Sequence, residues 1–240
     1  MKLQLIGTGS ITAPQTSASS LIDDRILIDC GTGVTKELLK RKVRIFDIEV
    51  ILITHLHGDH FFDLPYLILL RSFNEVTDSL KIYGPKNLKE SVEALFAIGF
   101  ADLENIEQFF IKGNTSIIEF DNLKVKMGDY NLESVLVDHG KTKPSYGYIV
   151  EKDGKRISFS GDSCYCQAIE DLVLNSSVAV LECGFPNNSR DHMGPETIEE
   201  LSAKGRIITT HMSLDTREKL QKMNLENVKV GADGDIFYIY

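Results

Sequence analysis

The stretch "HLHGDH" that begins at His55 places three of the chain's six histidines and one aspartate within six positions. Imidazole is a weak helix former and an uncommon core residue, so packing does not explain the cluster. His55 and His57 are two positions apart and point to the same side of an extended segment. Asp59 and His60 follow a glycine turn and present a second pair. Because imidazole nitrogens and carboxylate oxygens bind zinc, iron or manganese, the cluster predicts a metal site.

Three further metal-capable side chains follow apolar, strand-like runs elsewhere in the chain. "SVLVD" runs into His139, "RISFSG" into Asp162 and "GRIITT" into His211, in the way that "EVILIT" runs into His55. Side chains at strand ends are held by a rigid element and face solvent or a cleft, a position that functional groups favour. With the first cluster they make seven possible ligands. That number is too large for one zinc ion and fits two ions that share a bridging carboxylate.

The elements that must position these residues alternate along the chain. Runs rich in Ile, Leu and Val predict strands, and amphipathic runs between them predict helices. We expect strands at 2–7, 25–30, 49–55, 80–84, 123–130, 134–140, 146–151, 156–162, 178–183 and 205–211. We expect helices at 35–42, 61–73, 87–99, 166–175, 194–205 and 216–224. This mixture, without a long linker or a repeat, predicts one domain over 1–240, an α/β or α+β sandwich.

Composition and charge limit the partners and the location. Of the 240 residues, 42% are hydrophobic and 25% are charged, as in an ordinary globular protein. The net charge of −9 is unlike the basic balance of proteins that grip a long nucleic acid. The longest apolar run, 64–70, is too short to span a bilayer, and the opening residues do not resemble a signal peptide. The four cysteines form no Cys-x-x-Cys pair, so we expect reduced thiols in a cytoplasmic protein.

The chain resembles the metallo-β-lactamase superfamily, whose HxHxDH signature matches "HLHGDH". "GTGSITAP" at 7–14 is similar to that family's opening glycine turn, "LIDCGTG" at 27–33 to its LIDxG strand and loop, and "SGDS" at 160–163 to the motif with the bridging aspartate. Within the superfamily, the chain is most similar to the ribonuclease Z-like branch. The motifs that indicate this branch are "VDHG" followed by "SYGYIVE", "LEC" at 181–183, "DHMGPETIEEL" and "THMS".

This resemblance implies both a fold and a set of metal ligands. The fold is a four-layered αβ/βα sandwich of two mixed β-sheets flanked by helices, with the site along the edge where the sheets meet. The cofactor would be two divalent metal ions, zinc in the first place, with manganese or iron as alternatives. The ligands implied are His55, His57 and His139 for one ion, Asp59, His60 and His211 for the other, and Asp162 between the two.

The sixth histidine, His192, precedes a helix in "DHMGPETIEEL", and the resemblance implies a catalytic role for it rather than metal binding. We expect His192 to contact a phosphate oxygen of the substrate or to protonate the leaving alkoxide. Glu182 or Asp191 would orient the ring of His192, and the sequence leaves both alternatives open. Asp59 would also act in catalysis, by orienting a hydroxide that bridges the two ions and attacks phosphorus.

One departure from the family bears on the substrate. Enzymes of this branch that process tRNA carry a long glycine- and proline-rich arm between the motifs of His139 and Asp162, but here these residues are separated by only 23 positions. We therefore expect a dinuclear-zinc phosphodiesterase that cleaves a small or cyclic phosphodiester, a nucleotide-type substrate, or a short RNA end.

Three alternatives remain open at this point. The first is a tRNA 3′-processing endoribonuclease. The second is a hydrolase of a lactone, thioester or sulfate ester on the same fold. The third, from a different class, is a catalytically silent nucleotide-binding protein. The resemblance also implies a homodimer, since relatives in this branch are commonly dimers, and we expect no membrane partner.

Overall fold

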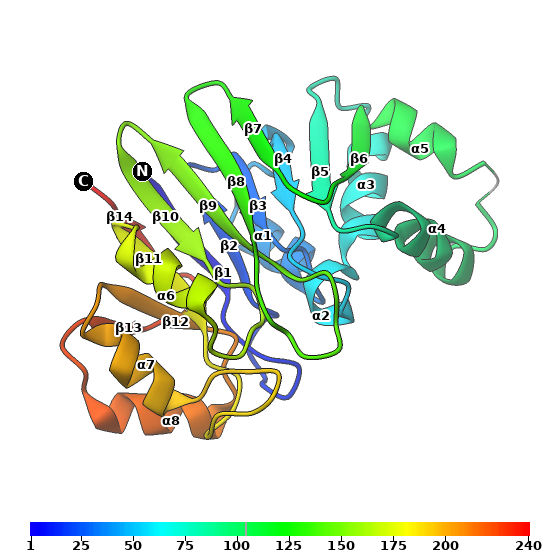
Figure 1. Ribbon diagram of the computed structural model, residues 1–240. Coiled ribbons are helices and arrows are strands. Elements are labelled where there is room, and N and C mark those ends of the chain that lie inside the picture. Colours follow the sequence, from blue (N-terminus) through cyan, green and yellow to red (C-terminus); the bar gives the residue numbers. More distant parts are fainter. Residues whose placement is uncertain (104) are drawn as a thin grey trace.

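Two β-sheets face each other at the centre of the computed structural model, which describes residues 1–103 and 105–240 (Figure 1). Sheet 1 contains β1 (Lys2–Gly7), β2 (Ser19–Ile22), β3 (Ile26–Ile28), β4 (Val50–Leu52), β5 (Leu80–Gly84), β6 (Thr115–Glu119) and β14 (Ile236–Tyr238). Sheet 2 contains β7 (Lys124–Met127), β8 (Tyr130–Leu136), β9 (Tyr146–Lys152), β10 (Lys155–Phe159), β11 (Val178–Glu182), β12 (Ile207–Thr210) and β13 (Val228–Val230). The strand orders are β14-β1-β2-β3-β4-β5-β6 and β13-β12-β11-β10-β9-β8-β7.

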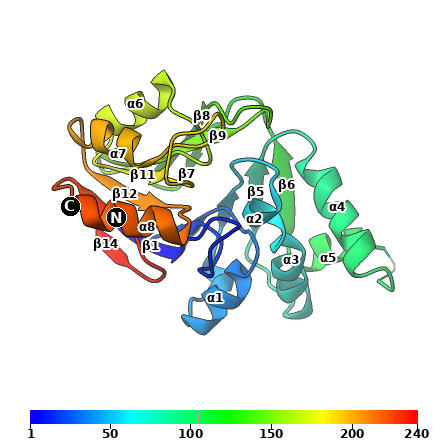
Figure 2. The ribbon, with the colours of Figure 1, turned by 90° about the horizontal axis from the view of Figure 1, so that it is seen from below.

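Helices cover the outer face of each sheet (Figure 2). Those on sheet 1 are α1 (Val34–Lys40), α3 (Leu64–Phe73), α4 (Leu88–Gly99) and α5 (Glu107–Lys112). Those on sheet 2 are α6 (Gln167–Leu174), α7 (Pro195–Ser202) and α8 (Leu214–Met223). Two short elements, the 3-10 turn η1 (Ile45–Asp47) and α2 (Gly58–Phe61), lie in the connections that flank β4. In the described ranges, no helix is both long enough and apolar enough to cross a membrane.

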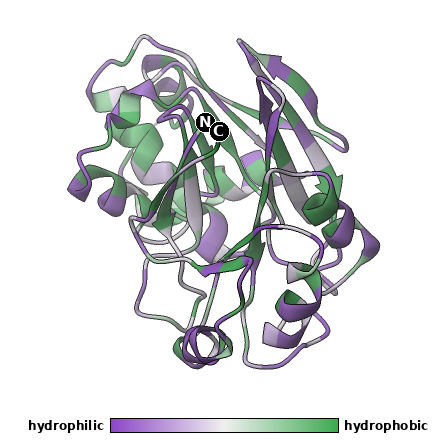
Figure 3. Cartoon of the chain, turned by 90° about the vertical axis from the view of Figure 1, so that its left-hand side faces the viewer, coloured by the Kyte–Doolittle hydropathy of each residue, from purple (hydrophilic) through white to green (hydrophobic). Residues whose placement is uncertain are grey.

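The alternation of side chains along the strands accounts for this layering. In β4, Ile51 packs in the same cluster as Leu38 of α1. The neighbouring residues Val50 and Leu52 point the other way, into a cluster between the sheets that also contains Tyr148 of β9. Figure 3 shows hydrophobic residues along the central strands, with hydrophilic residues frequent in the surrounding loops. The expected αβ/βα sandwich of two mixed sheets is confirmed.

The strand directions bring the chemically active residues to one edge. β3 and β4 run parallel in sheet 1, and β10, β11 and β12 run parallel in sheet 2. The carboxyl ends of parallel strands lie at the same edge of a sheet. Those of β3, β4, β10 and β12 lead into Asp29, His55, Asp162 and His211, and β11 ends at Glu182.

Three features of the fold differ from the sequence-based expectation. The strands expected over 123–130 and 134–140 are β7 and β8, and β8 ends at Leu136, so a short loop precedes His139. The helix expected over 61–73 is divided, because α2 ends at Phe61 and α3 begins at Leu64 with Pro65 in its first turn. Proline suits that position, where its missing N–H would have had no partner within the helix. The strands β2, β6, β13 and β14 and the helix α5 were not predicted. β13 and β14 are edge strands of three residues, and their pairing with distant segments rather than a local pattern makes them strands.

Candidate metal centre

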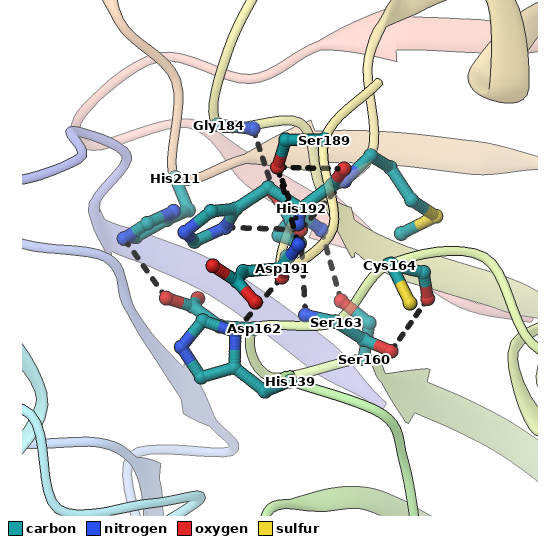
Figure 4. Close-up of polar contacts among 12 residues, drawn as sticks. His139, Ser160, Asp162, Ser163, Cys164, Gly184, Ser189, Asp191, His192 and His211 are labelled. Atoms are coloured by element: carbon teal, nitrogen blue, oxygen red, sulfur yellow. Dashed lines mark hydrogen bonds and ion pairs between the residues drawn. The ribbon is translucent and has the colours of Figure 1, made fainter. Parts of the chain in front are cut away.

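All seven candidate ligands converge at the edge where the two sheets meet. The structure gathers them in groups whose ligand atoms lie within 4.8 Å of one another. The groups are His55, His57, His139 and Asp162; Asp59, His60 and His211; and Asp162, His192 and His211. The first two groups are those that the resemblance implies. The third brings His192 to the same site, and Figure 4 shows His192, His211, His139 and Asp162 close together.

Asp162 occupies the middle of the cluster. Its Oδ2 atom lies 3.3 Å from Nε2 of His60 and 3.4 Å from Nε2 of His211. The same oxygen lies 3.8 Å from Nε2 of His55, which belongs to the other group. Asp162 is only 2% exposed, so this carboxylate is shielded from bulk water. One oxygen atom between two sets of imidazoles is the arrangement that a bridging ligand requires.

The other candidate ligands lie on either side of Asp162. Oδ2 of Asp59 lies 3.3 Å from Nε2 of His211 and 3.8 Å from Nε2 of His60. On the other side, Nε2 of His139 lies 3.3 Å from Nδ1 of His57. These two nitrogens are directed at the same point. One cation bound at that point would accept a lone pair from each of them.

A second layer of hydrogen bonds orients the imidazoles. Oδ2 of Asp29 lies 2.8 Å from Nδ1 of His60, and both oxygens of Asp29 also accept hydrogen bonds from Thr54, at 2.8 and 2.9 Å. The backbone carbonyl of Asp191 lies 2.8 Å from Nδ1 of His139. A partner on one ring nitrogen decides which nitrogen carries the proton and so which one faces the metal.

The backbone around the site is held in uncommon conformations. His211 has φ = 52° and Asp29 has φ = 58°, both in the left-handed region that few non-glycine residues adopt. A Cβ atom on Gly31 would lie 1.7 Å from the carbonyl oxygen of Asp59, so only glycine lets these two loops approach. Gly31 of "LIDCGTG" therefore allows close backbone packing beside the candidate ligands.

Two buried nitrogen atoms of the cluster suit a cation. Across the described ranges, Nε2 of His55 and Nε2 of His60 are buried without a hydrogen-bond partner. Buried polar atoms without a partner cost free energy, and native proteins rarely keep them. Two unpartnered imidazole nitrogens that face one carboxylate are a donor set that fits divalent zinc, manganese or iron.

The electrostatics of the cluster favour the same interpretation. Burial lowers the pKa of His55 well below its usual range, so this ring is neutral, the form that binds metal. Burial acts to raise the pKa of Asp162, but the neighbouring His211 and His60 outweigh it and hold the pKa well below its usual range. For His60, burial is outweighed by Asp162 and Asp29, which raise its pKa well above its usual value. A bound cation would displace that proton.

His192 and Glu182 form a separate pair at the rim of the cluster. Nδ1 of His192 lies 3.3 Å from Oε1 of Glu182. The Glu182 carboxylate also accepts hydrogen bonds from the backbone N–H groups of Met193 at 3.0 Å and Gly184 at 2.6 Å. Burial acts to lower the pKa of His192, but Glu182 outweighs it and raises the pKa. Of the two residues considered for orienting His192, it is Glu182 that contacts the ring, whereas Asp191 offers its backbone carbonyl to His139.

Sequence reasoning did not identify Asp29 and Thr142 as part of the site. Oγ1 of Thr142 lies 3.1 Å from Nε2 of His57. Thr142 thus contacts one ring nitrogen of His57, as Asp29 contacts one ring nitrogen of His60. Asp29 carries the same signal as the candidate ligands, because it is an acidic residue at the end of the apolar run "ILI" at 26–28. Thr142 lies in an irregular loop and carries no comparable signal. The segment between His139 and Asp162 consists of this loop and the β9–β10 hairpin, as expected.

The fold and the clustered histidines and aspartates define a metal-dependent, ester-cleaving hydrolase of the metallo-β-lactamase superfamily, of the ribonuclease Z-like type. A family model described as Anti-Pycsar protein Apyc1 matches residues 1–229, and the chain belongs to that family.

Known relatives agree with this classification. The chain is 35% identical over 223 residues to Ribonuclease Z of Geobacillus kaustophilus, and the match covers 87% of this chain and 67% of that protein. It is 34% identical over 160 residues to Ribonuclease Z of Enterococcus faecalis, where the match covers 63% of this chain and 49% of the relative. The match to the second relative thus spans about half of that relative's length.

Two solved structures share the fold. Human tRNase Z, short form, superposes with a TM-score of 0.76 at 21% identity, with 100% of both chains covered. The metallo-β-lactamase fold protein YhfI from Bacillus subtilis superposes with a TM-score of 0.77 at 19% identity, with 98% of both chains covered.

Proposed function

We propose that the protein is a phosphodiesterase with two divalent metal ions, zinc in the first place, that cleaves a small or cyclic phosphodiester or a short RNA end. One observation carries the proposal. Oδ2 of Asp162 lies between the two ligand groups, and His192 joins the same cluster without being needed to complete either group. A dinuclear site with an extra, separately oriented imidazole suits an in-line displacement at phosphorus.

The residues that would hold the ions are those of the two groups. His55, His57 and His139 would bind one ion, Asp59, His60 and His211 the other, and Asp162 both. A bound pair of divalent ions supplies a nucleophile at neutral pH and neutralises the charge that develops on the phosphate oxygens. Asp59 has a further role here, because its carboxylate lies at the edge of the cluster and can orient the attacking group. Its pKa is lowered by His211 and His60 against the effect of burial, so it is ionised.

His192 would act on the leaving group. With Nδ1 directed at Glu182, its other ring nitrogen is free to face the substrate, and Glu182 favours the protonated ring. A protonated His192 can donate to a phosphate oxygen and then transfer its proton to the leaving alkoxide. Glu182 is 1% exposed and its carboxylate is fixed by backbone N–H groups, so it acts as a positioning residue for His192 and does not touch the substrate.

Two features support a small substrate. The segment between His139 and Asp162 contains a short hairpin where an extended tRNA-clamping arm is expected, and the net charge is −9. The relatives named Ribonuclease Z favour a second candidate, endonucleolytic processing of the tRNA 3′ end. In that case another surface would have to bind the tRNA.

A substrate panel on metal-reconstituted protein tests the proposal. It includes bis(p-nitrophenyl) phosphate, a 2′,3′-cyclic nucleotide, a tRNA precursor with a 3′ trailer, a lactone and an aryl sulfate. We expect turnover of the small diesters, two ions per chain by elemental analysis, and loss of turnover in Asp162→Asn. Preferred cleavage of the tRNA precursor would favour the second candidate. Turnover of the lactone or the sulfate alone, or nucleotide binding without turnover, would reject phosphodiester chemistry.

A further inference from the structure

A small cavity lies between the two sheets, behind the metal centre. About 30 Å³ of it is open to the centres of water molecules. Its walls come from residues at or near the ends of β2, β3, β10, β11 and β12 and include Asp162, Thr210 and His211. Since one buried water needs about 10–15 Å³ measured in this way, the cavity has room for one or two.

Three of the residues that line this cavity carry a buried polar atom that needs a partner. Oδ1 of Asp162, Oγ1 of Thr210 and Nδ1 of His211 are buried, and none has a hydrogen-bond partner in the part of the chain that the structure describes. Asp162 is 2% exposed and His211 is 4% exposed, and although Thr210 is only half-buried its hydroxyl oxygen is buried, so bulk water does not reach the three atoms. An unsatisfied buried polar group costs about 1–3 kcal/mol, and three together are unusual in a native protein.

Two of these atoms, in Asp162 and His211, belong to candidate ligands whose other polar atom faces the metal centre. Oδ2 of Asp162 and Nε2 of His211 face each other at 3.4 Å on the metal side. The same two residues also line the cavity, and the opposite atoms of their side chains are buried without a partner among the described residues. If Nε2 of His211 binds metal, Nδ1 carries the proton and is a donor, whereas Oδ1 of Asp162 is an acceptor. The Thr210 hydroxyl can donate or accept, so the three atoms are complementary to one water molecule.

We propose that this cavity holds a buried water that accepts a hydrogen bond from Nδ1–H of His211, donates to Oδ1 of Asp162, and is fixed by the hydroxyl of Thr210. Thr210 is then a positioning residue for the bridging carboxylate, because it anchors the water that sets the carboxylate's orientation. The inference rests on the metal centre of the proposed function. It does not depend on which ester the protein cleaves.

The neighbouring residue in β12 provides a matched control. Thr209 is 0% exposed, and its hydroxyl lies 3.3 Å from Sδ of Met212. Met212 packs in the hydrophobic cluster under the helices of sheet 2, on the opposite face of the strand from the cavity. Thr209→Val and Thr210→Val therefore remove the same hydroxyl from adjacent positions of one strand, and only the second hydroxyl belongs to the cavity.

Zinc titrations against a competing chelator test the role of Thr210. We expect Thr210→Val to bind at least one zinc ion about tenfold more weakly, the usual lower bound for loss of an outer-shell partner. Thr210→Ser keeps the hydroxyl and should restore the wild-type affinity, and Thr209→Val should not change it. Wild-type zinc affinity in Thr210→Val would overturn the inference, and so would an equal loss in Thr209→Val.

A crystal structure of the zinc-loaded wild-type protein tests the water itself and needs no variant that must fold. We expect a water within about 3.2 Å of both Oδ1 of Asp162 and Oγ1 of Thr210. A dry cavity, or Oδ1 of Asp162 bound to a metal ion, would overturn the inference. These tests measure zinc affinity and electron density and do not depend on turnover. If the protein binds two zinc ions but cleaves no phosphodiester, the proposed reaction is wrong. The same measurements would still decide whether the buried water is present.

Discussion

Replacing Asp29 by asparagine tests whether the hydrogen bonds that orient the imidazoles control metal binding. For His60 to bind metal through Nε2, its Nδ1 must carry a proton, and Nδ1–H then donates a hydrogen bond to Oδ2 of Asp29, 2.8 Å away. The two oxygens of Asp29 also accept from the backbone N–H and the hydroxyl of Thr54. Asparagine has nearly the same size but offers an oxygen on one side only.

Both orientations of the asparagine amide are unfavourable. With its oxygen toward the Thr54 N–H, its NH₂ faces Nδ1 of His60 and favours the tautomer that carries the proton on Nε2, where it blocks metal binding. With the amide reversed, a buried backbone N–H loses its acceptor. Loss of an outer-shell partner typically lowers metal affinity 10–100-fold, which is about 1.4–2.7 kcal/mol.

A competitive zinc titration of Asp29→Asn measures this effect. Asp63→Asn is the matched control, because Asp63 is also a buried carboxylate, at 8% exposed, but accepts from the backbone N–H of Thr35 in α1 and not from a histidine. We expect weaker binding of one ion in Asp29→Asn and unchanged affinity in the control. If Asp29→Asn binds both ions as tightly as the wild type, the tautomer argument is wrong.

Four further predictions concern the pair at the rim, the ions and the glycine turn. His192→Ala should lower turnover of bis(p-nitrophenyl) phosphate by at least about 100-fold with unchanged metal content by elemental analysis; equal turnover would exclude the proton-transfer role. Glu182→Gln removes the charge that raises the pKa of His192, so the basic limb of the pH–kcat profile should move to lower pH; an unmoved limb contradicts this. Chelation should lower the melting temperature in calorimetry, since an ion at 1,000 times its Kd contributes about 4 kcal/mol; an unchanged temperature would contradict metal binding. Gly31→Ala forces a Cβ against the Asp59 carbonyl and should cost about 1–3 kcal/mol in urea unfolding, whereas wild-type stability would show that the loops can separate.

The sequence alone predicted the seven candidate ligands, because their signals are local. The "HLHGDH" cluster lies within six positions, and His139, Asp162 and His211 each follow an apolar run. Continuous apolar runs likewise predict the central strands, such as β4, in which every residue is buried. The physical cause of each of these signals, continuous burial or an abrupt change from apolar to polar residues, acts within a few neighbouring positions.

Only the tertiary structure decided how these residues are arranged. That Glu182 and not Asp191 contacts His192, and that Asp29 contacts His60 from 31 positions away, depends on which strand ends become neighbours. The short edge strands β13 and β14 exist through pairing with β12 and β1, and the cavity behind Asp162 exists because two separate sheets meet there. Such contacts join segments far apart in the chain, and their free energy depends on the packing of the whole sandwich, which no local pattern encodes.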